Sequence, residues 1–320
     1  MKMESNELAL VSIISLLILL AGCIDGGSSG EYPDIERESK IPADSEKVTP
    51  ETDVHPPLLH SDEYQDPVPV SDVINTAGGE DSPYILPRGK TFYFFFTPDV
   101  SVPAEEQIND DVTGIYVTKK VGSKWSEPER VWLQDPGRLA LDGAPTVAGD
   151  RMYFASAREG YTGMHIFTAE KVDGEWANWE HGGERFDEMD VGELHVVGAH
   201  LYFHSGRSGG KGEYDIWMTA REGDSWGEPM NIEAVNSAEN DGWPYVTPDE
   251  KELWFTRQHS GAPSIWRSKK VNGTWGEPEM ILSRFAAEPT LDAQGNIYFA
   301  HHYFKDDEMI EADIYVCHRT

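Results

Sequence analysis

Five copies of a unit of about 50 residues, each holding four short β-rich runs, predict an all-β chain folded as a five-bladed β-propeller. The third run of each copy is marked by an isoleucine followed by an aromatic residue. Successive isoleucines lie 51, 50, 49 and 49 residues apart: Ile115, Ile166, Ile216, Ile265 and Ile314. Four strands at this period are typical of a propeller blade. We number the copies repeats 1 to 5.

The other runs recur in a fixed order around this marker. An acidic residue stands just before the first run, and an apolar–aromatic–Phe triplet forms the second. The triplets are Phe92-Tyr93-Phe94, Met152-Tyr153-Phe154, Leu201-Tyr202-Phe203, Leu253-Trp254-Phe255 and Ile297-Tyr298-Phe299. In repeats 1 to 4 a Gly-containing turn, such as Asn272-Gly273, leads to a tryptophan on the fourth run, and such turns suit tight hairpins. We expect the repeated aromatic residues to fill the space between neighbouring sheets.

Repeat 5 ends at Thr320 and leaves no room for a fourth strand. The missing strand is predicted at the other end of the propeller, where Tyr64-Gln65-Asp66-Pro67 matches the Trp-Gly-Glu-Pro pattern of Trp226 to Pro229. We therefore expect the N-terminal segment to close the last blade. Such closure removes open sheet edges, which otherwise promote aggregation.

The best-preserved copy, residues 240–256, reads NDGWPYVTPDEKELWFT and resembles the WD40-like repeats of TolB-like β-propeller proteins. The resemblance covers about Tyr64 to Arg319. It implies a fold whose members bind partners, carry substrates or serve as sensors. The turn from Val172 to Trp176 is loosely similar to the Asp-box turn of sialidases, and five-bladed propellers also include glycoside hydrolases that act on furanose polymers.

The N-terminus predicts a membrane anchor. The apolar run LALVSIISLLILLA, residues 8–21, has the length of a signal-peptide core and is shorter than the roughly 20 residues of a spanning helix. It leads into Gly22-Cys23, which resembles a lipoprotein box and implies lipidation of Cys23. Residues 1–23 are then a signal peptide, and the body lies lipid-anchored on the extracytoplasmic face of the cell membrane. The alternative is an uncleaved N-terminal anchor.

Composition sets further limits. Residues 24–60 are polar and rich in Gly, Ser, Pro and Glu, which predicts a disordered stalk before a propeller over 61–320. The chain has 57 acidic and 26 basic residues and a formal net charge of −31, so nucleic-acid binding is not expected. With Cys23 lipidated, Cys317 has no disulfide partner, and we expect it to be buried.

The loops that enter the first strands of a propeller meet around the mouth of its central channel. We expect acidic residues and arginines to gather there: Asp81, Asp142, Asp190, Glu193, Asp241, Glu288, Arg158, Arg207 and Arg257. Three interpretations stay open. The acids pair with arginines, or they bind a cation such as calcium, which takes 6–8 oxygen ligands, or two of them act as the carboxylates of a glycosidase.

No phosphate-binding glycine loop, metal-spaced Cys/His set or nucleophile elbow occurs in the sequence. The sequence therefore favours a non-catalytic, surface-anchored binding or scaffolding module, without a cofactor unless calcium binds, whose partner is a protein or a glycan. The alternative is a glycan-active enzyme, a glycosidase or a sialidase-like protein, that uses the carboxylates at the channel mouth.

Overall fold

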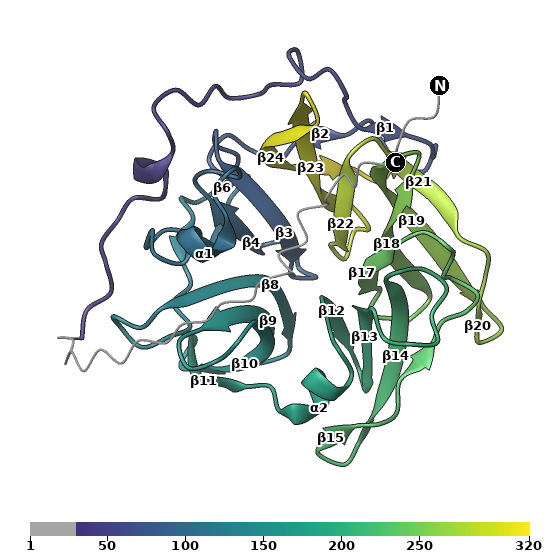
Figure 1. The fold of residues 1–320 in the computed structure, drawn as a ribbon. Helices are drawn as coiled ribbons and strands as arrows, with labels where there is room; N and C mark the ends of the chain where they lie inside the picture. Colours follow the sequence, from purple (N-terminus) through teal and green to yellow (C-terminus); the bar gives the residue numbers. More distant parts are fainter. Residues whose placement is uncertain (1–29) are drawn as a thin grey trace.

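The computed structural model describes residues 30–320, and these form a β-propeller (Figure 1). The predicted all-β fold is confirmed. The sheets surround a central axis, and the first strand of each repeat lies nearest to it (Figure 1). The predicted signal peptide and Cys23 lie outside the described residues. Within residues 30–320, no helix has both the length and the apolar character needed to span a membrane.

Each repeat forms an antiparallel group of strands. Repeat 1 contains β3 (Gly79–Ile85), β4 (Thr91–Thr97), β5 (Gly114–Val121), β6 (Lys124–Trp125) and β7 (Glu129–Arg130). Repeat 2 contains β8 (Ala140–Ala148), β9 (Arg151–Arg158), β10 (Met164–Val172) and β11 (Glu175–His181). Repeat 3 contains β12 (Leu194–Val197), β13 (His200–Ser205), β14 (Asp215–Glu222), β15 (Ser225–Trp226) and β16 (Met230–Asn231).

The last two repeats follow the same plan. Repeat 4 contains β17 (Asp241–Val246), β18 (Glu252–His259), β19 (Ala262–Val271), β20 (Thr274–Trp275) and β21 (Glu279–Ser283), and repeat 5 contains β22 (Ala286–Leu291), β23 (Ile297–Lys305) and β24 (Glu308–Cys317). The helical turns are η1 (Arg37–Lys40), α1 (Ala104–Gln107) and α2 (Glu184–Glu188). The hydrogen-bonded sheets number four rather than five, because one parallel pair, Ala312 with Gly79, joins repeats 5 and 1.

The N-terminal segment supplies the outer strand of repeat 5, as predicted. β2 (Val68–Pro69) pairs antiparallel with β24, and the amide of Gln65 donates a hydrogen bond of 2.8 Å to the carbonyl of His318. The preceding strand, β1 (Leu58–Leu59), pairs with β21 of repeat 4, which the sequence does not predict. The segment therefore fastens two neighbouring repeats.

The repeated aromatic residues pack between neighbouring sheets, as expected. Phe92 and Phe94 of repeat 1 share a buried cluster with Tyr298 of repeat 5, and Trp254 of repeat 4 shares another with Phe299. Each fully buried side chain of this size contributes about 1.5–3 kcal/mol. Cys317 is also buried in the second cluster. The core thus consists of layers between the repeats.

The composition predicts a disordered stalk over residues 24–60, but residues 30–60 lie against the propeller (Figure 1). The Arg37 side chain is buried and pairs with Glu80, 3.4 Å away. Lys47 forms an ion pair with the buried Glu311 on β24. Composition overlooks this ordering because the segment is held by its basic side chains, which meet buried acids, rather than by an apolar face of its own.

A second basic residue fixes the closing segment from the propeller side. The Arg267 side chain on β19 is fully buried and lies 2.5 Å from Glu63, 2.7 Å from Glu279 and 3.7 Å from Glu252. The hydrogen bond from Arg267, together with its charge, lowers the pKa of Glu63 to about 2. One guanidinium therefore bridges three carboxylates where the segment crosses repeat 4.

Replacing this guanidinium should destabilise the protein. We expect Arg267→Met to lower the free energy of unfolding by about 2 kcal/mol, because three neighbouring carboxylates lose their shared cation. The matched control is Arg138→Met, which breaks an exposed pair with Glu159 and should cost less than about 1 kcal/mol. Urea unfolding measures both, and equal losses would contradict the assigned role of Arg267.

Candidate functional site

A β-bulge at one position of the first strand shapes the central channel. In four repeats the bulged residue has a positive φ and precedes a proline: Ser82 (45°), Ala144 (49°), Trp243 (51°) and Glu288 (57°). The strand pairing shifts at each of these positions. Strand pairing places Glu193 of repeat 3 at the corresponding position. Bulges re-aim side chains, and all five of these residues line the channel.

The register divides the acids near the central axis into two sets, the first of which includes Glu80, which is not among the predicted site residues. Glu80, Asp142 and Asp241 stand opposite Phe96, Ser156 and Arg257, at equivalent positions of their repeats. The sequence pattern places Asp81 with Asp142 and Asp241, but the register gives that position to Glu80. Asp81, Glu193 and Glu288 lie at or next to the bulge instead. We call these three the channel acids.

The first set is paired with arginines, as one of the three interpretations predicts. The pairs are Glu80 with Arg37 (3.4 Å), Asp142 with Arg158 (2.9 Å) and Asp241 with Arg257 (2.5 Å). Arg158 and Arg257 come from the adjacent strand of the same repeat rather than from a neighbouring repeat. All three carboxylates are fully buried, and each arginine offsets part of the cost of burying a charge. Burial still raises the pKa of Glu80 to about 8 and raises the pKa of Asp241. These acids are structural.

The channel acids lack such partners. Within the described part of the chain, none of them forms an ion pair with an arginine or a lysine. Asp81 lies 3.3 Å from Nε2 of His302 and shares a hydrogen bond with Glu288. The side chain of Trp243 donates a hydrogen bond to Glu193. One buried oxygen of Glu288, Oε2, has no hydrogen-bond partner.

The channel acids have different pKa values because their surroundings differ. Burial, followed by the negative charge of Asp81, raises the pKa of Glu193 to about 8. Burial and the charges of Asp81 and Glu193 raise the pKa of Glu288 well above its ordinary value. Burial opposes ionisation of Asp81 as well, but the charge and hydrogen bond of His302 lower its pKa. At neutral pH the site therefore holds an ionised Asp81 beside a protonated Glu193, a division that suits acid–base chemistry.

Two predicted mouth residues lie elsewhere. Asp190 is exposed in the loop after α2 and lines a second pocket, between repeats 2 and 3. The guanidinium of Arg207 lies over the ring of Trp217, 5.1 Å from its centre, and pairs with none of the predicted acids. Neither residue is part of the channel, because repeat 3 lacks the buried Asp–Arg pair of repeats 2 and 4.

Sequence reasoning missed the aromatic wall of the channel. Tyr84, His195 and Tyr245 follow the bulge by two residues in their repeats and line the channel with Trp243. Burial lowers the pKa of His195 to about 4, so this ring is neutral. The channel is narrow, and the space in it that water can occupy is about 40 Å³. Alignment of the repeats on their prolines is the signal that would have found these residues.

Neither known protein-family profiles nor curated proteins match the sequence. Solved structures match its fold. An endo-arabinase from Bacteroides thetaiotaomicron matches at 15% identity and TM-score 0.49 over 79% of this chain and 96% of that one. An α-L-arabinofuranosidase from Lactobacillus brevis matches at 14% identity and TM-score 0.49 over 75% and 90%. TolB from Acinetobacter baumannii matches at 13% identity and TM-score 0.45. This match covers 78% of this chain and 56% of the TolB chain.

These likenesses concern the fold, and they correct one prediction. The sequence favours a non-catalytic module because its repeats carry no catalytic motif. Several of the matching structures are glycoside hydrolases. The channel acids also lack the arginines that a purely structural ring requires. The non-catalytic prediction is therefore wrong.

The raised pKa of Glu193 makes stability depend on pH. Its contribution is fully present below the ordinary value of 4.5 and is lost as the pH rises through about 8, because the folded protein must then ionise a buried carboxyl. Glu193→Gln cannot ionise. We therefore expect the melting temperature of this variant, relative to the unchanged protein, to rise between pH 5 and pH 9.

Thermal melts at pH 5, 7 and 9 measure this difference. The control is Glu105→Gln on α1, an exposed residue whose substitution should shift the melting temperature equally at each pH. A difference for Glu193→Gln that stays constant with pH would show that this carboxyl is already ionised at pH 5.

Proposed function

We propose that the protein is a glycan-active enzyme that hydrolyses glycosidic bonds at the mouth of its central channel. The observation that carries the proposal is the set of channel acids, Asp81, Glu193 and Glu288. Glu193 and Glu288 line the channel, and Asp81 shares a hydrogen bond with Glu288 beside it. The three have no arginine or lysine partner among the described residues, and their pKa values are shifted in different directions. The structural acids of the other set show that the same fold pairs its carboxylates where it needs no reactivity.

Hydrolysis of a glycosidic bond needs one carboxyl group that donates a proton and a second that is ionised. Glu193 is the proton donor in our proposal, because its carboxyl is protonated at neutral pH and gives its proton to the leaving oxygen. Asp81 is the ionised group, which activates water or attacks the anomeric carbon. His302 keeps Asp81 ionised, and Glu288 orients it through their shared hydrogen bond.

Aromatic side chains hold the channel acids in place. Tyr84, Trp243 and Tyr245 line the channel with Glu193 and Glu288, and all three aromatic residues are buried. The side chain of Trp243 donates a hydrogen bond to Glu193. The aromatic wall thus fixes the proposed proton donor, and in our proposal the sugar meets it at the open end of the channel.

Substitution of the channel acids tests the proposal. We expect Glu193→Gln and Asp81→Asn each to lower kcat/KM at least about 100-fold on a panel of aryl glycosides, arabinan and xylan. The panel includes pentofuranosides because matching structures carry the names arabinase and arabinofuranosidase. Release of reducing sugar or of the aryl group is the measurement.

The matched control for these variants is Glu105→Gln, an exposed carboxyl on α1 that should leave kcat/KM unchanged. Assays with added calcium and with a chelator separate the acid–base role from the cation-binding interpretation of the ring. No turnover of any glycan by the unchanged protein, or equal turnover by Asp81→Asn, would refute the proposal.

The proposed enzyme is held at the cell surface through Cys23. This extends the lipoprotein-box pattern at residues 20–23, which lies outside the described residues. We expect the unchanged protein to fractionate with membranes and to enter the detergent phase. Cys23→Ala should move at least about tenfold more protein to the soluble fraction if lipid is the anchor, and an unchanged distribution would favour the uncleaved N-terminal anchor.

A further inference from the structure

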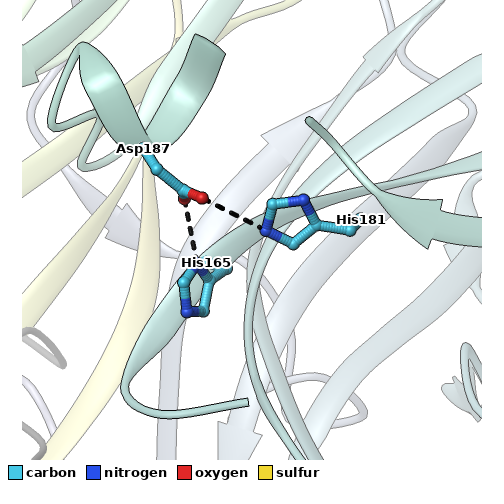
Figure 2. Close-up of side chains that lie close together, drawn as sticks. All are labelled: His165, His181 and Asp187. Atoms are coloured by element: carbon cyan, nitrogen blue, oxygen red, sulfur yellow. Dashed lines mark hydrogen bonds and ion pairs between the residues drawn. The ribbon is translucent and has the colours of Figure 1, made fainter. Parts of the chain in front are cut away.

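Two histidines and an aspartate meet on the outer part of repeat 2, away from the channel acids. His165 lies on β10, His181 ends β11, and Asp187 lies on α2, and Figure 2 shows the three side chains turned toward one another. Nδ1 of His165 is 2.9 Å from Oδ1 of Asp187, and Nε2 of His181 is 3.5 Å from Oδ2. One candidate ligand atom from each residue lies within 4.8 Å of the others.

We infer that His165, His181 and Asp187 form a binding site for a divalent transition-metal ion of the zinc class. Zinc binds imidazole nitrogen and carboxylate oxygen at about 2.0–2.2 Å, so two ligands of a tetrahedral ion lie about 3.4 Å apart. The two nitrogen–oxygen separations, 2.9 Å to Oδ1 and 3.5 Å to Oδ2 of Asp187, lie on either side of this value, and ligand atoms of the three residues lie within 4.8 Å of one another. A single ion between the three side chains therefore requires them to draw together around it.

The hydrogen bond on the far side of His165 favours a metal ligand. Its Nε2 lies 3.1 Å from the carbonyl oxygen of Thr162, and its Nδ1 lies 2.9 Å from Oδ1 of Asp187, and both of these oxygens can only accept. A metal ion can take the place of a proton between Nδ1 and the carboxylate of Asp187. The ring then carries its proton on Nε2 and donates it to Thr162, the kind of backbone contact by which ligating histidines are usually oriented.

His181 has to change tautomer to bind the metal. The amide of Gly183 donates a hydrogen bond of 3.1 Å to its Nδ1, so the neutral ring carries its proton on Nε2, the nitrogen that faces Asp187. Coordination through Nε2 moves this proton to Nδ1 and requires the Gly183 amide to turn away. Gly183 has a φ of 103° and open space where a Cβ would be. Because protons compete with the metal for imidazole nitrogen, metal affinity should rise with pH.

The ligands select the class of ion. Imidazole suits zinc, copper, nickel and iron, whereas calcium and magnesium take oxygen ligands. The three side chains are 22%, 21% and 40% exposed, so coordination positions remain open to water. The net charge of −31 favours any cation. The ion would connect β10, β11 and α2. The inferred metal site uses none of the channel acids, so it does not depend on the proposed hydrolysis.

Zinc titration of the full chain tests the inference. Equilibrium dialysis with metal analysis should find one tight Zn²⁺ per chain, which excess Ca²⁺ does not displace, and Zn²⁺ should raise the melting temperature. We expect His181→Gln and Asp187→Asn to weaken binding at least tenfold and to abolish the rise. The control is His318→Gln, which removes an exposed histidine outside the cluster and should change neither.

Unchanged Zn²⁺ affinity in both variants, or full competition by Ca²⁺, would overturn the site, because the ion would then be held by the acidic surface. Circular dichroism reports whether each variant folds. If a variant does not fold, Co²⁺ bound to the unchanged protein decides the question. Strong visible absorption of a four-coordinate, nitrogen-bound ion supports the site, and the weak spectrum of the hydrated ion overturns it.

Discussion

Closure of the ring is the constraint on which the rest of this structure depends. Each repeat can bury its aromatic residues only against its neighbours, so the first and last repeats must meet. β2 provides this closure by pairing with β24, and Arg267 holds the same segment through Glu63. With the ring closed, five first strands face one axis and place residues from repeats 1, 3 and 5 within reach of each other.

The site arises from a small difference between equivalent positions. Glu80, Asp142 and Asp241 lie before the bulge, where each meets an arginine. Glu193 and Glu288 lie at the bulge and line the channel, where no arginine among the described residues pairs with them. The register at the bulge thus separates the acids that are fixed by arginines from the acids that line the channel.

The segment before the propeller, residues 30–60, is ordered by ion pairs with buried acidic residues of the sheets. Arg37 and Lys47 reach the buried acids Glu80 and Glu311, and Asp53 meets His301, 2.9 Å away. Each contact supplies the charge that a buried group of the propeller lacks. The segment and the sheets therefore stabilise one another, and Ile41, Val48 and Leu59 add apolar contacts with the core.

The sequence by itself determined the β-propeller, the order of strands within each repeat, and the closing strand near Tyr64. These follow from periodic patterns and turn residues, which act locally and recur five times. Only the tertiary structure decided which acids are paired, because the register around each bulge and the position of Arg37 depend on contacts between distant residues. The separation of Asp190 and Arg207 from the channel, and the meeting of His165, His181 and Asp187, were decided in the same way.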